Sequence, residues 1–361
     1  MFGYLVNQKP FLLGKLKNGT AEFEVAEAIN SAAAIKSVVV FKALSTVYFF
    51  SFLVSMLFYW GALQWLVVQL GWLLQASLGT TACESLNAAA NIFLGQATAP
   101  LLVKPYLARL TRSEIHAIMT GGFATIAGTV LAAYISFGVP SAHLVSASVM
   151  SAPAALAFAK LFYPETEKSR TKAENIVIEA PQEANVLDAA TQGATSAGIL
   201  VVNITAIVVA FIAFMAFLNS IAAWLGDLVG VQGVSFDFLL GKLFIPLSFL
   251  LGVDWADCEK VSRLIGIKTV LNEFIAYREL GQLIAAREIS ARSQVIATYA
   301  LCGFANPGSI GVQLATLSSL APERKADFAA VVVRAFVSGS AACLLTACVA
   351  GSLYSPASDL Q

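Results

Sequence analysis

Long apolar stretches separated by short polar ones dominate this chain. A helix that crosses a lipid bilayer needs about 20 mostly apolar residues. Single stretches of that kind lie at 116–139, 143–163, 198–225, 296–320 and 328–354. A longer apolar stretch at 38–78 predicts either one strongly tilted helix or two pieces broken near Gly61. The pattern therefore predicts an all-α polytopic membrane protein.

Two further apolar segments are interrupted by residues that end a helix. The segment 85–110 is broken at 95–100, and the segment 236–280 is broken at 252–255 and continues as a mixed helix. Backbone that leaves the helix at membrane depth is found only where protein or a water-filled cavity satisfies its polar groups. Each segment is therefore predicted to be a re-entrant hairpin beside a binding site.

A weak internal repeat links these hairpins to the spans that follow them. The glycine-rich stretches 122–129 and 303–311 resemble each other, and each follows a hairpin and precedes one more span. The stretch 198–225 between the two units crosses the membrane once, so the second unit is inverted relative to the first. Inverted repeats with discontinuous helices are typical of secondary transporters, which bind substrate and coupling ion near the membrane midplane.

The pattern divides the chain into seven parts. We expect an N-terminal interfacial segment at 1–37, a scaffold helix at 38–78, a first transport repeat at 79–163, a cytoplasmic polar loop at 164–186, a second scaffold helix at 187–232, a second transport repeat at 233–354 and a tail at 355–361. The loops 104–114, 164–190 and 321–326 share one face and carry eight lysine and arginine residues, whereas the loops of the opposite face carry only Arg278, Arg287 and Arg292. Because positive charge is enriched in cytoplasmic loops, this face is predicted to be cytoplasmic.

Composition excludes most other classes of protein. Hydrophobic residues make up 58% of the chain and charged residues only 12%, against roughly 25% charged residues in a soluble domain. The net charge is zero, so nothing indicates a nucleic-acid partner. The five cysteines form no CxxC pair, and His116 and His143 are far apart with no nucleophile or nucleotide motif beside them. We therefore expect neither an enzyme nor a zinc site.

The first hairpin offers oxygen ligands in an apolar setting. Asn91, Gln96, Thr98 and the later Thr125 carry polar side chains, and an unwound tip also exposes carbonyl groups. The oxygens of Asn91 and Thr125, together with the exposed carbonyls, suit a hard monovalent cation, whereas Gln96 and Thr98 can bond a ligand. The alternative is that these side chains only connect helices within the membrane.

Glu273 is the most informative single residue of the second unit. A carboxylate inside a membrane is costly and marks a functional site by default. A substrate with several hydroxyl groups suits Glu273, Asn306 and Ser309, while Phe304 covers an aromatic ring. The alternatives for Glu273 are an ion pair with a nearby basic residue such as Lys268 or Arg278, or a position at the membrane interface. The alternative for Phe304 is a packing role.

At these motifs the sequence closely resembles the concentrative nucleoside transporters, which are sodium-coupled nucleoside carriers. The stretches that carry the resemblance are 84–96, 99–107, 119–130, 272–277 and 302–306. The resemblance implies a homotrimer in the plasma membrane, in which scaffold helices surround a mobile transport domain made of the two repeats. It also implies nucleoside uptake driven by a sodium (or proton) gradient, with sodium as coupling ion and no other cofactor.

The resemblance also implies a role for each candidate site residue. The sodium ion would be bound by the Asn91 side chain and carbonyl, the Leu94 carbonyl, the Thr125 hydroxyl and the Ile126 carbonyl. The nucleoside would be bound by Gln96 and Val130 at the base, by Glu273, Asn306 and Ser309 at the ribose, and by Phe304. Thr98 is a further substrate-binding candidate, because its hydroxyl at the hairpin tip can form a hydrogen bond with a ligand.

One departure from the family's pattern keeps other functions open. The family's first hairpin tip contains Gly-Gln-Thr-Glu-Ala-Pro, whereas here Ala97 replaces the hydroxyl and Thr98 replaces the carboxylate. A substrate-shifted or non-transporting membrane binding protein on the same fold is therefore the second hypothesis. A channel is the third, and it requires a continuous polar pore. In addition, the stretch 1–6 resembles a segment that follows at least two earlier helices in the family, which indicates a truncated chain or a short isoform.

Overall fold

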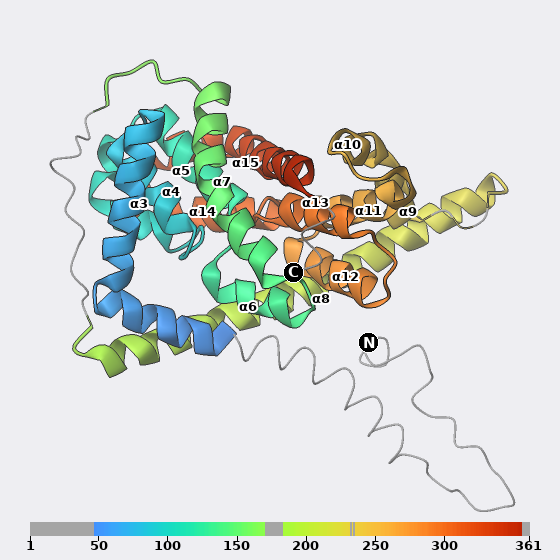
Figure 1. The fold of residues 1–361 in the computed structure, drawn as a ribbon, viewed down its shortest axis with the longest axis horizontal. Coiled ribbons are helices and arrows are strands. Elements are labelled where there is room, and N and C mark those ends of the chain that lie inside the picture. The colour runs from blue at the N-terminus through green and yellow to red at the C-terminus, as the bar shows by residue number, and fades with distance from the viewer. Residues whose placement is uncertain (1–46, 170–182, 232, 234, 356–361) are drawn as a thin grey trace, which may run out of the picture.

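The structure is a computed structural model that describes residues 47–169, 183–231, 233 and 235–355. These residues form helices and loops, and no strand occurs among them. The predicted all-α architecture is thus confirmed (Figure 1). The predicted interfacial segment at 1–37 and the tail beyond 355 lie outside the described residues.

The first apolar stretch forms two helices rather than one tilted helix. Helix Val47–Tyr59 is followed by α3 (Ala62–Leu78), and the two are bent by 77° at the break between them. Gly61 stands at the break with φ +77°, a left-handed conformation that a glycine adopts without a steric penalty. Trp65 and Trp72 project from α3 and are exposed, as expected for side chains that face lipid.

The first unit consists of a hairpin, a broken span and an unbroken span. Its elements are α4 (Ala82–Asn91), the 3-10 helix η1 (Ala99–Arg109), α5 (Arg112–Ala124), α6 (Gly128–Ser136) and α7 (Ser141–Phe162). The hairpin arms α4 and η1 pack on each other. The predicted span at 116–139 lies within the segment Arg112–Ser136, which is long and apolar enough to cross a membrane, but it is not one continuous helix, because α5 ends at Ala124 and extended backbone precedes α6. The Gly128 N–H leaves the helical pattern to donate to the Phe93 carbonyl of the hairpin, at 2.9 Å.

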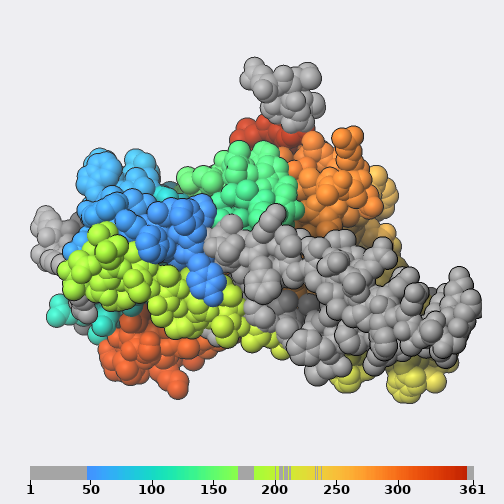
Figure 2. Space-filling model, turned by 90° about the horizontal axis from the view of Figure 1, so that it is seen from below, coloured from blue at the N-terminus to red at the C-terminus, as the bar shows by residue number. Residues whose placement is uncertain are grey.

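The connecting helix α8 (Val186–Leu228) is 43 residues long. At 1.5 Å per residue it measures about 65 Å, roughly twice the hydrocarbon thickness of a bilayer. It runs across the whole molecule in Figure 1, and in Figure 2 it lies beside helix Val47–Tyr59. The two helices touch closely, because a Cβ added to Gly193 would lie 2.2 Å from the Ser55 hydroxyl.

The second unit repeats the order of the first. Its elements are α9 (Phe236–Leu243), α10 (Ile245–Leu250), η3 (Trp255–Asp257), α11 (Cys258–Val270), α12 (Glu273–Ala285), α13 (Ala291–Leu301), α14 (Pro307–Leu320), η4 (Pro322–Arg324) and α15 (Lys325–Leu353). The chain leaves the helix at 251–254 as predicted, but a second break at Leu271 and Asn272 separates α11 from α12. The expectation of a continuous helix through Asn272 and Glu273 is therefore wrong, since Asn272 caps α12 with its side chain.

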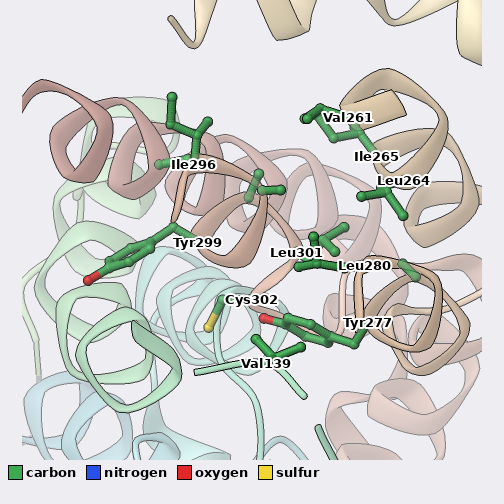
Figure 3. Close-up of a cluster of buried hydrophobic side chains, with 14 of the residues drawn as sticks. Val139, Val261, Leu264, Ile265, Tyr277, Leu280, Ile296, Tyr299, Leu301 and Cys302 are labelled. Carbon is green, nitrogen blue, oxygen red and sulfur yellow. The ribbon is translucent and has the colours of Figure 1, made fainter. Parts of the chain in front are cut away.

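By length and composition alone, three helical segments among the described residues can span a membrane. They are Arg112–Ser136, Ser141–Phe162 and Pro322–Leu353, and the bent pair Val47–Tyr59 with Ala62–Leu78 makes a fourth if it counts as one span. The last helix, α15, packs on α5, α7 and α13 and so holds the two units together. Beside it, Tyr277, Leu280 and Cys302 belong to the large buried cluster of the second unit (Figure 3).

Three loops meet at one end of the two units. The Thr111 hydroxyl donates to the Glu165 carboxylate at 2.7 Å, and the Arg324 guanidinium donates to the Leu110 carbonyl at 2.9 Å. These contacts join parts of the loops 104–114, 164–190 and 321–326, which the charge pattern assigns to one face. Next to them, Lys160 forms an ion pair with the buried Glu84 at the start of the first hairpin.

Candidate functional site

The two broken spans cross at their breaks. The Phe304 N–H donates to the Thr125 carbonyl at 3.3 Å, so the gap between α13 and α14 lies against the gap between α5 and α6. A Cβ added to Gly303 would come within 2.5 Å of the Phe123 carbonyl, which shows how closely the two chains approach. Side chains from both repeats therefore meet at this crossing.

Glu273 lies at the first position of α12, beside the second break. Its carboxylate is buried and accepts from the Tyr134 hydroxyl at 3.3 Å and from the Asn306 side-chain amide at 3.1 Å. The start of a helix also favours a negative charge. Two neutral donors leave several lone pairs of the carboxylate free to accept from a ligand.

The predicted alternative for Glu273, an ion pair with a neighbouring basic residue, is not seen. Within the described part of the chain, no lysine or arginine lies at ion-pair distance from its carboxylate. Lys268 instead donates to the Ala300 carbonyl at 2.9 Å. Glu273 thus keeps its acceptor capacity for other groups.

The Asn306 side chain is held in one orientation by two hydrogen bonds, one that its oxygen accepts and one that its nitrogen donates. Its side-chain oxygen accepts from the Ser309 N–H at 3.0 Å and caps α14, while its amide nitrogen donates to Glu273. The side chain cannot turn over without losing both bonds. The sequence caps α14 in the ordinary way, with asparagine followed by proline.

Tyr134 is a site residue that the sequence analysis missed. Its ring stacks on Tyr277 with the centroids 4.4 Å apart, and this contact aims its hydroxyl at Glu273. Tyr134 and Glu273 are 139 positions apart, so no local pattern connects them.

Asn91 has the geometry of a cation ligand. Its amide nitrogen donates to the Asn87 carbonyl at 3.0 Å, and because a carbonyl only accepts, the side-chain oxygen must point the other way. That oxygen is buried and has no hydrogen-bond partner among the residues that the structure describes. The Asn91 amide lies 3.3 Å from a Cβ added to Gly121, whose carbonyl accepts from the Thr125 hydroxyl at 2.8 Å. Asn91 and Thr125 therefore flank the same turn of α5.

The other predicted site residues differ in how deeply they are buried. Ile126 and Val130 are buried on either side of the start of α6, whereas Leu94 and Phe304 are partly buried. Thr98 is exposed at the start of η1, and it makes no hydrogen bond to Glu273 among the described residues. These roles stay predictions.

Three more buried amide oxygens share the pattern of Asn91, and two of the residues were not predicted. The oxygens of Asn87, Gln96 and Gln313 lack hydrogen-bond partners within the described ranges. Asn87 donates to the Ile118 carbonyl at 3.3 Å, and Gln313 donates to the Met119 carbonyl at 3.0 Å. Asn87 precedes Asn91 by four positions, so helical spacing alone places both on one face of α4. The centre thus contains an excess of acceptors, which suits a cation or a ligand that carries N–H and O–H donors.

His, Cys, Asp and Glu side chains form no group of three or more that could hold a metal ion in the described part of the chain. The oxygens beside Asn91 belong to amide, hydroxyl and carbonyl groups. Amide, hydroxyl and carbonyl oxygens are hard ligands and suit a hard cation.

Two units of hairpin and broken span whose breaks lie against each other are typical of secondary transporters built from inverted repeats. Comparison with known proteins gives the particular family. Residues 143–351 match the family model described as Na+ dependent nucleoside transporter C-terminus, and residues 40–141 match a model described as Gate, nucleoside recognition. The chain belongs to this family of sodium-dependent nucleoside transporters, which confirms the predicted resemblance and excludes an enzyme.

Individual relatives agree with this assignment. The chain is 50% identical over 335 residues to human solute carrier family 28 member 3, covering 89% of the chain and 48% of that protein. It is 48% identical over 369 residues to sodium/nucleoside cotransporter 1 of Rattus norvegicus, covering 98% of the chain and 56% of that protein. The chain thus spans about half the length of these relatives.

Solved structures show the same fold. The structure of CNTnw in an inward-facing substrate-bound state matches with a TM-score of 0.82 and 42% identity, over 87% of this chain and 74% of that one. A CNTnw variant in an intermediate state matches with a TM-score of 0.85 and 40% identity, over 92% and 80%. The architecture is therefore that of a polytopic nucleoside-transporter fold.

Proposed function

We propose that this protein carries nucleosides into the cell across the plasma membrane, driven by a sodium (or proton) gradient. The observation that carries the proposal is the pairing of Glu273 with Asn306 at the crossing of the two breaks. A buried carboxylate with free lone pairs is a strong acceptor for vicinal hydroxyl groups, because hydrogen bonds to charged groups are about twice as strong as neutral ones. Ribose is the part of a nucleoside that offers such hydroxyls.

The remaining substrate contacts follow from the same placement. Ser309 lies on the first turn of α14 beside Asn306, so both can bind the ribose together with Glu273. Phe304 stands in the break that crosses Thr125 and is suited to cover the ligand. Gln96, Thr98 and Val130 are then left for the nucleobase, at the side of the first hairpin.

Sodium coupling is proposed to occur at Asn91, Leu94, Thr125 and Ile126. The first two belong to the hairpin and the last two to the break in the first span, and the bond from Gly128 N–H to the Phe93 carbonyl joins these segments. An ion bound between them would fix the hairpin tip against the break. Because Gln96 belongs to the same tip, ion binding and nucleoside binding would strengthen each other.

We further propose an elevator-like movement in a homotrimer. CNTnw has been solved in inward-facing, intermediate and outward-facing states. In this chain, α8 and helix Val47–Tyr59 pack on each other and expose large apolar side chains such as Phe49 and Phe217, which suits a scaffold that faces lipid and other protomers.

Uptake of radiolabelled nucleoside into proteoliposomes tests the proposal and separates the three hypotheses. A carrier shows saturable uptake that rises with an inward sodium gradient. A binding protein binds nucleoside without uptake, and a channel gives flux that neither saturates nor depends on sodium. Either of the last two results would overturn the proposal.

A further inference from the structure

Gln313 is a buried amide in α14 that none of the roles above uses. It follows Ser309 by four positions, so both side chains project from the same face of the helix toward the crossing. Only 2% of Gln313 is exposed. The face of α14 that carries Asn306 and Ser309 therefore continues one turn further with Gln313.

The orientation of the Gln313 amide is fixed by its partner. Its nitrogen donates to the Met119 carbonyl in the first repeat at 3.0 Å, and a carbonyl has no hydrogen to donate. The amide oxygen must therefore point away from Met119. In the part of the chain that the structure describes, this oxygen has no hydrogen-bond partner. A buried acceptor left unpaired costs free energy and calls for an explanation in a native protein.

Gln96 of the first hairpin lies against the same turn of α5. A Cβ added to Gly122 would lie 2.1 Å from the Gln313 amide nitrogen and 3.0 Å from Cβ of Gln96, so both glutamines pack on this glycine. The Gln96 side-chain oxygen is also buried without a partner among the described residues. Two glutamine side chains, one from each repeat, thus pack on the same glycine, and each carries a buried oxygen without a partner among the described residues.

We propose that Gln313 is a further substrate-binding residue, whose side-chain oxygen accepts an N–H group from the edge of the nucleobase next to Gln96. The proposal rests on the proposed function and assigns the base end of the site to both repeats. Two acceptors without a donor select for a donor edge, such as an exocyclic amino group or a ring N–H. They form no hydrogen bond with a base that presents only acceptors at this position.

Gln313→Met tests this assignment, because methionine has nearly the same length but accepts hydrogen bonds only weakly. The measurement is calorimetric binding of nucleosides at saturating sodium. Three matched pairs differ in one donor group: adenosine and purine riboside, cytidine and 2-pyrimidinone riboside, uridine and 3-methyluridine. Gln282→Met is the control, since Gln282 is exposed on α12 away from the crossing.

The parent is expected to prefer the donor-bearing member of at least one pair. Gln313→Met should weaken binding of that member by about threefold to tenfold, the value of one neutral hydrogen bond, and leave its partner almost unchanged. The control should preserve the parent's preference. An unchanged preference in Gln313→Met would overturn the proposal, as would a parent that binds both members of every pair equally.

Two further readouts separate other roles for Gln313. If the variant instead raises the sodium concentration needed for binding and keeps the base preference, the oxygen serves the cation and the proposal is wrong. A loss of thermal stability with unchanged base preference would likewise assign Gln313 a structural role. If Gln313→Met does not fold, Gln313→Asn provides a second comparison, because it keeps the amide but draws its oxygen back by one methylene group. A parent that binds no nucleoside at all would refute the proposed function itself.

Discussion

Replacement of Glu273 by glutamine is expected to weaken nucleoside binding while preserving the local fold. The Asn306 amide nitrogen faces the carboxylate at 3.1 Å and cannot exchange places with its oxygen, which accepts from the Ser309 N–H at 3.0 Å. The new amide must therefore turn its nitrogen toward the Tyr134 hydroxyl, which can accept as well as donate. One orientation of glutamine thus retains both contacts.

The expected loss follows from the change of a charged acceptor into a neutral one. A hydrogen bond to a charged group contributes about 1.5–3 kcal/mol and a neutral one about 0.5–1.5 kcal/mol, so each ribose hydroxyl loses about 1–1.5 kcal/mol. Two hydroxyls lose about 2–3 kcal/mol together, which corresponds to a rise in Kd of about 30-fold to 150-fold.

Calorimetric titration of nucleoside into the purified protein at saturating sodium measures this loss. A 2′,3′-dideoxynucleoside should bind the parent weakly and respond little to Glu273→Gln, because it lacks both hydroxyls. Glu259→Gln is the matched control, since Glu259 is exposed and pairs with Lys242 at 3.0 Å. An unchanged Kd for the full nucleoside, or an equal loss for the dideoxy analogue, would refute the assignment of Glu273 to the ribose.

Three other changes give distinct expectations. Asn91→Ala should raise the sodium concentration for half-maximal uptake more than it changes nucleoside affinity at saturating sodium, because it removes an oxygen from the ion; a parental sodium dependence would contradict this. The double change Ala97→Thr and Thr98→Glu should increase nucleoside affinity or broaden the accepted substrates only when sodium or protons are supplied, since an unpaired carboxylate in a membrane is costly. Flux over a range of sodium concentration and pH measures this, and weaker uptake than a robust parent would contradict it. Gly281→Ala should lower the unfolding temperature of the detergent-solubilised protein, because its Cβ would lie 2.0 Å from the Phe137 carbonyl; an unchanged temperature would contradict the packing.

The sequence predicted those elements whose boundaries coincide with a change in hydropathy. Helices α7 and α15 begin and end close to the predicted spans 143–163 and 328–354, since polar residues flank both. The break near Gly61 was one of the two alternatives that the pattern left open for 38–78, because a glycine interrupts a long apolar stretch there. Glu273 stood out because a carboxylate within apolar residues is rare.

The break between α5 and α6 could not be predicted from local pattern, unlike the breaks at the two hairpins. Residues 125–127 are ordinary for a helix, and the chain leaves the helix there because distant groups replace the lost hydrogen bonds: the Phe93 carbonyl binds Gly128 N–H, and the Phe304 N–H binds the Thr125 carbonyl. Gln313 has its partner 194 positions away, at Met119. Such contacts are properties of the tertiary fold, so the sequence indicates only that a site exists at the breaks.

The unpaired oxygens at the crossing suggest why ion and substrate should bind together. Asn91 reaches the crossing from the first repeat and Gln313 from the second, and the amide of each is held by a backbone carbonyl of α4 or α5. A cation bound at Asn91 leaves the Gln313 oxygen unpaired, and a nucleobase donor bound at Gln313 leaves the Asn91 oxygen unpaired. Only the two ligands together satisfy both. Each ligand also stabilises the helices that orient the amide for the other ligand. The two binding free energies are therefore coupled, and this coupling must be reciprocal.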